Sequence, residues 1–287
     1  MNKDFLVVVL FFLVILIFTI IYFNKKLDVT RYNIENKKIP QGFNGFKIAQ
    51  VSDFHSRNGK LGLWLDPFYK KLENEKPNII VVTGDLINLD KEDDIKYAMN
   101  FLDKASKIAP TYYIYGNHEA SFKRKTLLDL EEHYKDNPNI IFLNNKKVDL
   151  IKNDEKITLV GVDDLYSFGK KKSAYVGKIK ELSGCENYTI LLSHRPEYFD
   201  TYVENDYDLV FCGHTHGGQA RIPFIGGVIA PDQGYFPKYD FGLFKEKNTT
   251  MIISRGLGNT VAMLAQLRIN NSPELVIVEL KSIKKEA

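Results

Sequence analysis

The chain has 287 residues, of which 44% are hydrophobic, and its formal net charge is +3. This length allows one large globular domain or two small ones, and no low-complexity tract or internal repeat interrupts it. The net charge is too small, and the lysines too scattered, for a nucleic-acid-binding surface, so we expect no nucleic acid partner. The two cysteines, Cys185 and Cys212, are too few for a disulfide framework and do not have zinc-knuckle spacing.

An apolar run near the N-terminus, Phe5–Phe23, is interrupted only by Thr19 and flanked by lysines. A helix of about 19 residues, rising ~1.5 Å per residue, nearly crosses a hydrocarbon core of roughly 30 Å. A cleaved signal peptide is the alternative, but the run is longer than a typical signal core and no small-residue cleavage site follows it. We therefore predict a single transmembrane anchor over residues 1–25 that holds the protein in the cell membrane.

The remaining chain is predicted to contain a tether and leading strand over 26–45 and one domain over 46–287. Strands are expected at 29–34, 46–51, 78–82, 112–115, 140–143, 156–161, 188–192, 207–210, 249–254 and 274–280. Helices are expected at 61–75, 91–107, 123–135 and 172–182. This alternation predicts an α/β fold in which two mixed β-sheets pack face to face between helices.

Polar clusters follow the predicted strands at their carboxyl ends, where open α/β sheets bind their ligands. The clusters are Asp53-Phe54-His55, Gly84-Asp85, Gly116-Asn117-His118-Glu119, Ser193-His194-Arg195 and Gly213-His214-Thr215-His216. These clusters contain five of the six histidines in the chain. The sixth, His133, is expected on the exposed face of a helix.

Imidazole nitrogens, carboxylates and an amide oxygen, without any thiolate, suit Mn, Fe or Zn in an open catalytic site. We predict these metal ligands: Asp53, His55, Asp85, Asn117, His194, His214 and His216. Asp53, His55 and His216 are assigned to one ion, and Asn117, His194 and His214 to a second. Asp85 has two carboxylate oxygens and can bridge the two ions. Two ions about 4 Å apart can clamp the attacking and leaving oxygens of an in-line displacement. His214 and His216 are two residues apart in backbone expected to be extended, which would turn both rings to the same side.

Several neighbours of these ligands are candidates for substrate contact. His118 follows Asn117 in a tight turn, and we expect it to hydrogen-bond a phosphoryl oxygen or to protonate the departing alkoxide. Glu119 could orient the His118 ring, but an exposed position at a helix start is favoured. Arg195 and Arg255 are candidates for phosphate binding, with a surface or packing role as the alternative for each.

These motifs resemble the calcineurin-like metallophosphoesterase superfamily over about residues 46–281, and no block of the pattern is missing. The resemblance implies a β-sandwich flanked by helices, the calcineurin-like metallophosphoesterase fold. It also implies two divalent metals bridged by Asp85, in-line attack by a metal-bridging hydroxide, and His118 as catalytic acid or phosphate binder.

Four further segments resemble a bacterial branch of this superfamily that carries an N-terminal membrane helix or an export signal. They are Gly217-Gly218-Gln219, Ala230–Gly234, Phe236–Tyr239 and Ser254–Asn259. The export signals imply an extracytoplasmic catalytic domain, which we expect here. The lysines after the anchor favour the cytoplasmic side instead. The tract 260–267 departs from the pattern of this branch, because it is longer and more apolar than expected before Arg268.

The leading prediction is a membrane-anchored, dimetal phosphoesterase that hydrolyses a phosphomonoester or phosphodiester. A hydrolase of a lipid-linked pyrophosphate is the alternative, motivated by the anchor and by the aromatic residues of segment 235–244 beside Lys238. An ordinary hairpin core explains the same aromatic residues and is the favoured interpretation of them. A non-catalytic metal-binding scaffold is the alternative from another class, but such a protein would be expected to lack His118 or a metal ligand.

Overall fold

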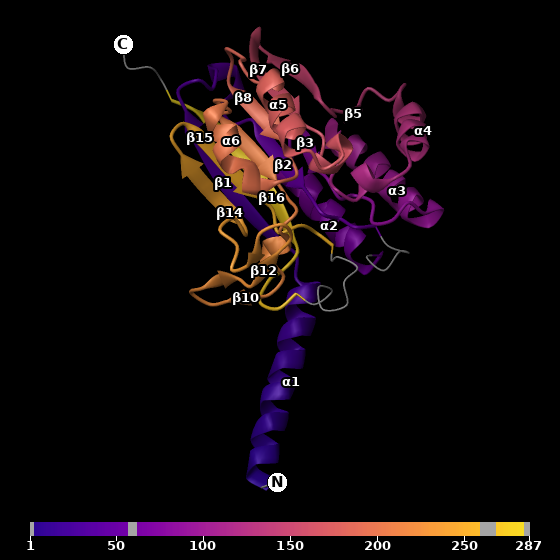
Figure 1. Ribbon diagram of the computed structural model, residues 1–287, viewed down its shortest axis with the longest axis vertical. Coiled ribbons are helices and arrows are strands. Elements are labelled where there is room, and N and C mark those ends of the chain that lie inside the picture. Colours follow the sequence, from indigo (N-terminus) through magenta and orange to yellow (C-terminus); the bar gives the residue numbers. More distant parts are fainter. Residues whose placement is uncertain (1–2, 57–61, 259–267, 284–287) are drawn as a thin grey trace.

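The computed structural model describes residues 3–56, 62–258 and 268–283. Two six-stranded sheets lie face to face, and helices cover both outer faces (Figure 1). The predicted α/β sandwich is therefore confirmed. The tract 260–267, which departs from the resemblance, lies outside the described residues.

The first sheet has the strand order β1-β16-β2-β3-β4-β5. Its strands are β1 (Asp28–Asn36), β2 (Lys47–Val51), β3 (Ile79–Thr83), β4 (Thr111–Ile114), β5 (Ile140–Phe142) and β16 (Glu274–Ser282). Strands β2 to β5 run parallel to one another, and β16 is antiparallel to β2. Strand β1 pairs with β16, so the predicted leading strand forms an edge of the folded body.

The second sheet has the order β14-β15-β9-β8-β7-β6. Its strands are β6 (Lys146–Lys152), β7 (Glu155–Gly161), β8 (Thr189–Leu192), β9 (Leu209–Cys212), β14 (Gly242–Glu246) and β15 (Thr249–Ile253). The four inner strands are parallel, while β6 and β14 are antiparallel edge strands. The sequence analysis missed both edge strands, because half-exposed edges do not carry the apolar runs of buried strands.

Alternate residues of the inner strands enter different cores, as the two-residue period of a strand requires. In β3, Ile79 and Val81 face the space between the sheets, whereas Ile80 and Val82 pack under the helices. In β8, Ile190 packs between the sheets and Leu191 faces outward. Both faces of these strands are thus buried, which accounts for their unbroken apolar sequences.

The helices begin and end close to their predicted bounds. Helices α2 (Gly62–Glu75), α3 (Glu92–Ile108) and α4 (Arg124–Tyr134) cover the first sheet, and α5 (Lys172–Leu182) and the unpredicted α6 (Phe199–Glu204) cover the second. Short 3-10 turns occur at η1 (Gln41–Phe43), η2 (Glu119–Ser121), η3 (Leu165–Phe168), η4 (Pro196–Tyr198) and η5 (His216–Gly218).

Two small ribbons project from the end of the body where the chain emerges from α1 (Figure 1). Strand β10 (Arg221–Ile222) pairs with β11 (Gly226–Gly227), and β12 (Ile229–Ala230) pairs with β13 (Gly234–Tyr235). The aromatic segment after them is divided. Tyr239 is buried against Phe199 and Phe244, as a hairpin core predicts, whereas Tyr235 and Phe236 are exposed.

Helix α1 (Lys3–Lys25) extends away from the body as a single stalk (Figure 1). An 18-residue window within its stretch Lys3–Asn24 has a mean hydropathy of 3.3, and the stretch is long and apolar enough to cross a membrane. A signal sequence has the same length and composition, so the helix is a candidate span. At its base, the Asn24 amide donates to the Arg268 carbonyl (2.8 Å) and accepts from the Arg268 backbone N–H (3.3 Å).

The β6–β7 hairpin offers a direct test of the sandwich. Ile157 is 0% exposed between the sheets, whereas Ile151 on the paired strand is 75% exposed. Ile157→Ala should lower the free energy of unfolding by about 2–5 kcal/mol, because it leaves a cavity in the core. Ile151→Ala, the matched control, should change it by no more than about 0.5 kcal/mol. Chemical denaturation in detergent measures both, and equal effects would contradict the packing.

Candidate metal centre

The predicted ligands converge at one edge of the sandwich, although they come from distant parts of the chain. Each follows the carboxyl end of an inner strand: β2, β3 and β4 in the first sheet, β8 and β9 in the second. Among the described residues, three potential cation-binding groups are formed by Asp53, His55, Asp85, His118, His194, His214 and His216. All of these except His118 are buried. A fourth group joins His214 to the less buried carboxylates of Glu197 and Asp232.

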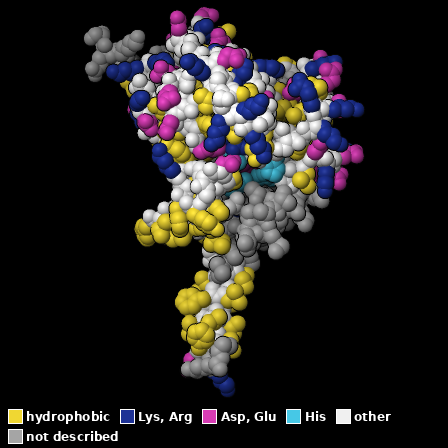
Figure 2. Space-filling model, viewed as in Figure 1, with side chains coloured by type: hydrophobic (Ala, Val, Ile, Leu, Met, Phe, Trp, Pro, Cys, Tyr) yellow, Lys and Arg dark blue, Asp and Glu magenta, His cyan; other side chains and the backbone are white. Residues whose placement is uncertain are grey.

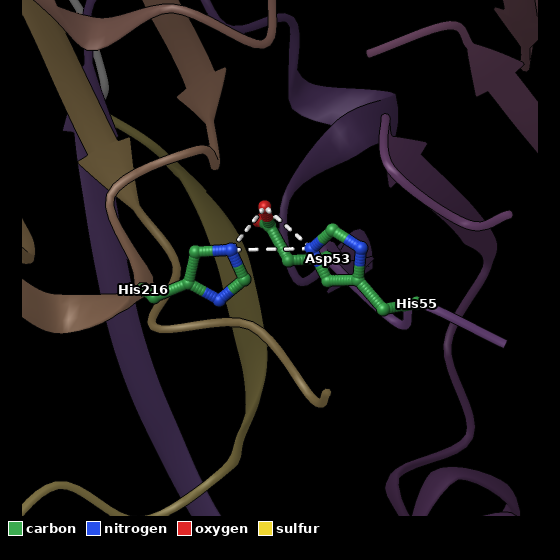
Figure 3. A group of neighbouring side chains, drawn as sticks. All are labelled: Asp53, His55 and His216. Carbon is green, nitrogen blue, oxygen red and sulfur yellow. Dashed lines mark hydrogen bonds and ion pairs between the residues drawn. The ribbon is translucent and has the colours of Figure 1, made fainter. Parts of the chain in front are cut away.

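Asp53, His55 and His216 form the first group, and their polar atoms point toward one another (Figure 3). The two Nε2 atoms of His55 and His216 are 3.2 Å apart. Asp53 Oδ1 lies 3.4 Å from His216 Nε2 and 3.9 Å from His55 Nε2. Burial lowers the pKa of His55 to about 3 and holds the pKa of His216 well below its ordinary value, because a buried site disfavours the charged imidazolium. Neutral imidazoles and a carboxylate are donors that fit a divalent cation.

Asp85, Asn117, His194 and His214 form the second group. His194 Nε2 lies 3.3 Å from Asp85 Oδ2, 3.2 Å from Asn117 Oδ1 and 3.2 Å from His214 Nδ1. The other ring nitrogen of His194 donates to the Thr83 carbonyl at 2.7 Å, which turns Nε2 toward the group. Burial opposes charge on His194, but Asp85 outweighs this effect and raises its pKa to about 10.

Asp85 lies between the two groups. Its Oδ2 atom is 3.3 Å from His194 Nε2 and 3.8 Å from His55 Nε2. Its Oδ1 atom accepts the backbone N–H of His118 at 3.0 Å, which fixes the carboxylate. Burial alone would raise the pKa of Asp85, but His194, His118 and His55 hold it well below its usual range. One carboxylate oxygen is therefore available to both groups.

The backbone at this edge is strained where it carries the ligands. Positive φ angles occur at Asp53 (49°), His55 (46°), Asp85 (52°), His214 (72°) and His216 (50°). Such conformations cost about 1–3 kcal/mol each outside glycine and gather at functional sites. The expectation of extended backbone at His214 and His216 was wrong. The backbone of both residues has a positive φ angle, and His216 lies in the first group and His214 in the second, the division that the ligand assignment predicts.

Glycines allow the loops to approach one another. Gly84 has a φ of 90°, and a Cβ atom there would lie 2.6 Å from both Gly116 Cα and His194 Nδ1. At Gly256, with φ of 71°, a Cβ atom would lie 2.6 Å from the Asp53 Cβ. Any side chain at these positions would displace a ligand or its loop.

His118 lies at the open side of the centre, and its side chain is 24% exposed. Its Nδ1 atom is 2.7 Å from the Asn88 carbonyl, and its Nε2 atom is 3.9 Å from Asp85 Oδ2. Burial lowers its pKa, but Asp85 and the Asn88 carbonyl outweigh this effect, so the net shift is upward. The ring is thus held in place and keeps a proton more readily than a free histidine.

Glu119 corrects one expectation, because it is buried and not exposed at a helix start. Its carboxylate accepts the backbone N–H groups of Asp85 (3.0 Å), Ile87 (2.7 Å) and Gly116 (2.9 Å). It also accepts the hydroxyl of Tyr113 at 2.9 Å. Glu119 therefore joins the loops that follow β3 and β4. Glu119 directly follows Asn117 and His118 in the sequence, and this position was the signal that could have indicated a role at the site.

Arg195 is held by carboxylates. Its side chain is 1% exposed, and Nε donates to Asp164 at 2.6 Å. Its Nη1 donates to Asp232 at 2.6 Å, and the same Asp232 oxygen lies 3.0 Å from His214 Nε2. This geometry favours a positioning role for Arg195 over phosphate contact. Asp232, which the ligand analysis missed, orients His214. Asp232 lies in Ala230–Gly234, one of the segments that resemble the bacterial branch of the superfamily.

Arg255 has a similar environment. Its Nη2 atom donates to Glu274 at 3.1 Å and to Asp28 at 3.3 Å, and the guanidinium stacks over Phe241 at 5.0 Å. These contacts favour packing over phosphate binding. His133 is exposed on α4, as predicted.

A family model described as calcineurin-like phosphoesterase matches residues 46–218. The chain is 30% identical over 261 residues to the uncharacterized metallophosphoesterase YkuE of Bacillus subtilis, covering 89% of this chain and 86% of the relative. It is 29% identical over 238 residues to phosphodiesterase YaeI of Escherichia coli, covering 82% of each. It is 24% identical over 301 residues to UDP-2,3-diacylglucosamine pyrophosphatase LpxG of Chlamydia trachomatis, covering 88% of each.

The role of Glu119 leads to a prediction about stability and metal affinity. In Glu119→Gln, an NH₂ group replaces an acceptor of backbone N–H groups, so unfolding should become easier by about 1–3 kcal/mol. Metal affinity should fall as well, because the loops that carry Asp85 and Asn117 lose their common partner. Denaturation and metal titration measure the two effects. Glu132→Gln on exposed α4 is the control, and a Glu119 variant that behaves like it would contradict the bracing role.

Proposed function

Because the chain belongs to the calcineurin-like phosphoesterase family, and is thus a metal-dependent hydrolase of phosphate esters, we propose that it cleaves a phosphomonoester or phosphodiester at a two-metal centre. The observation that carries this proposal is the position of Asp85 Oδ2, within 3.3 Å of His194 Nε2 and 3.8 Å of His55 Nε2. A carboxylate shared in this way can serve two ions.

We assign the ligands by group. Asp53, His55 and His216 would hold one ion. Asn117, His194 and His214 would hold the other, and Asp85 would contact both. Mn, Fe or Zn suits this set of nitrogen and oxygen donors. When bound, two such ions lower the pKa of a shared water and offset the charge that develops on the phosphoryl group.

The protein side chains supply orientation and a proton. His118 lies at the open side of the centre, where its Nε2 can donate to a phosphoryl oxygen or to the departing alkoxide. The Asn88 carbonyl fixes the ring through Nδ1. Because the pKa of His118 is raised, the protonated form persists at neutral pH better than in a free histidine. Asp232 and Arg195 keep His214 in position.

Replacing His118 separates catalysis from folding. His118→Ala should lower kcat by about 10²–10⁴-fold, the usual contribution of a positioned acid. Metal content and unfolding should stay near those of the wild type, because the ring is not assigned as a ligand and is partly exposed. His133→Ala on exposed α4 is the matched control and should keep full activity. Wild-type turnover in His118→Ala on aryl phosphates would remove His118 from the mechanism.

We propose that the protein is a single-pass membrane protein, with its anchor at 1–25, a tether and leading strand at 26–45, and the catalytic domain at 46–287. The apolar stalk α1 supports the anchor. The resemblance to exported relatives supports an extracytoplasmic catalytic domain. The lysines that follow α1 favour the opposite side.

A lipid-linked pyrophosphate is the second candidate substrate. Two observations favour it: the similarity to LpxG, named as a UDP-2,3-diacylglucosamine pyrophosphatase, and a stalk suited to hold the body beside lipid. A non-catalytic scaffold is disfavoured, because every predicted ligand and His118 is present and they converge.

A comparison of substrates tests the lipid candidate. Manganese-loaded full-length protein in vesicles should hydrolyse a nucleotide-linked lipid with a higher kcat/KM than a soluble aryl phosphate or an aryl phosphodiester. The reason is that anchoring places enzyme and lipid in the same layer. Asp85→Asn should lose activity on every substrate and serves as the background control. If the soluble esters are preferred, the lipid candidate fails and the phosphoesterase proposal stands.

A further inference from the structure

The two ribbons expose a cluster of large apolar side chains, which we call the ribbon patch. Its members are Ile222, Phe224, Ile225, Ile229, Tyr235 and Phe236. Phe224 is fully exposed, and it lies in the turn between β10 and β11. Scattered apolar residues are normal on a protein surface, but a cluster of this kind marks an interaction site.

The ribbon patch is held outward by a polar framework at its base. Asp240 accepts the Gly227 N–H at 2.8 Å and an Arg221 guanidinium N–H at 2.7 Å. The Val228 N–H donates to the carbonyls of Gly218 (3.1 Å) and Ala220 (2.9 Å). These bonds tie the first ribbon to Asp240, just before β14, and tie the junction between the two ribbons to the loop after β9. The apolar side chains therefore cannot retreat into the core without breaking these hydrogen bonds.

The location of the ribbon patch identifies its partner. Figure 2 shows the apolar ribbons at the end of the body from which the apolar stalk emerges, whereas the charged side chains visible on this face lie mostly farther from the stalk. At the base of the stalk, Lys26 Nζ lies 5.6 Å from the ring centre of Tyr22. Tyrosine and lysine together are typical of the membrane–water interface. The interface would thus lie at the level of the ribbons.

We propose that the ribbon patch inserts into the boundary between headgroups and acyl chains of the bilayer that holds α1. Aromatic and aliphatic side chains on a polar base are the usual composition of interfacial contacts. The anchor keeps this end of the body next to lipid, which raises the effective concentration of the bilayer at the ribbon patch far above that of any soluble partner. The proposal rests on α1 being embedded, and it does not depend on the substrate.

Insertion would fix the orientation of the body. A single membrane helix leaves the body free to tilt on the bilayer surface, whereas a second contact beside the helix removes that freedom. Histidine side chains are visible in Figure 2 in the half of the body from which the stalk emerges, so the docked orientation would keep the metal centre on the membrane side of the body. Substrates at the bilayer surface would then reach the centre more readily than in an undocked protein.

Fluorescence quenching tests the insertion directly. The chain has one tryptophan, so Trp64→Phe gives a background into which single probes are placed. Phe224→Trp and Tyr235→Trp report on the two ribbons, and Phe12→Trp reports on α1. Ile151→Trp is the matched control, because it is 75% exposed on β6 at the opposite end of the body. Full-length variants are reconstituted in phosphatidylcholine vesicles with and without brominated acyl chains.

We expect quenching at positions 224 and 235 to be severalfold stronger than at 151. Quenching at 12 but not at either ribbon position would overturn the docking and leave the anchor intact. If quenching is absent at position 12 as well, both the docking of the ribbon patch and the membrane anchor are overturned. A ribbon emission that shifts to the blue with protein concentration, without quenching by lipid, would assign the ribbon patch to a second copy of the chain and overturn insertion. None of these outcomes depends on hydrolysis, so they leave the proposed reaction to its own tests.

Discussion

The candidate metal centre depends on the position of one buried carboxylate, that of Asp85. Asp85 can lie between two groups of nitrogen and oxygen donors only because strands from both sheets end at the same edge of the sandwich. Its Oδ1 atom is held by the His118 N–H, and its backbone N–H is held by Glu119. The remaining oxygen faces His55 and His194. The sandwich, the strained loops and the close glycines can all be understood as ways to keep that oxygen shared.

The same centre is linked to the base of the stalk. Arg268 is buried and donates to the carbonyls of Arg255 (2.8 Å) and Gly258 (2.6 Å). The Gly258 N–H donates in turn to the Asp53 carbonyl at 2.7 Å. Because the Asn24 side chain holds the backbone of Arg268, a continuous set of hydrogen bonds joins the end of α1 to a predicted ligand. The stalk end of the molecule and the candidate metal centre are therefore neighbours.

Sequence patterns predicted most of the fold, because the inner strands are buried on both faces and their apolar runs are unmistakable. The same patterns placed the ligand motifs at strand ends. Three features escaped them because each depends on tertiary contacts. His214 and His216 have positive φ angles where extended backbone was expected. Glu119 is drawn inward by three backbone N–H groups. Arg195 is held by Asp164 and Asp232, which lie 31 and 37 residues away along the chain.

The shared carboxylate can be tested most directly by electron paramagnetic resonance of the protein loaded with two Mn(II) ions per chain. If Asp85 contacts both ions, they lie about 4 Å apart, as in other two-metal sites, and their spins must couple. The spectrum should then show the broad, temperature-dependent signal of an exchange-coupled pair. Two independent six-line signals of isolated Mn(II) would contradict the two-metal centre on which the account depends.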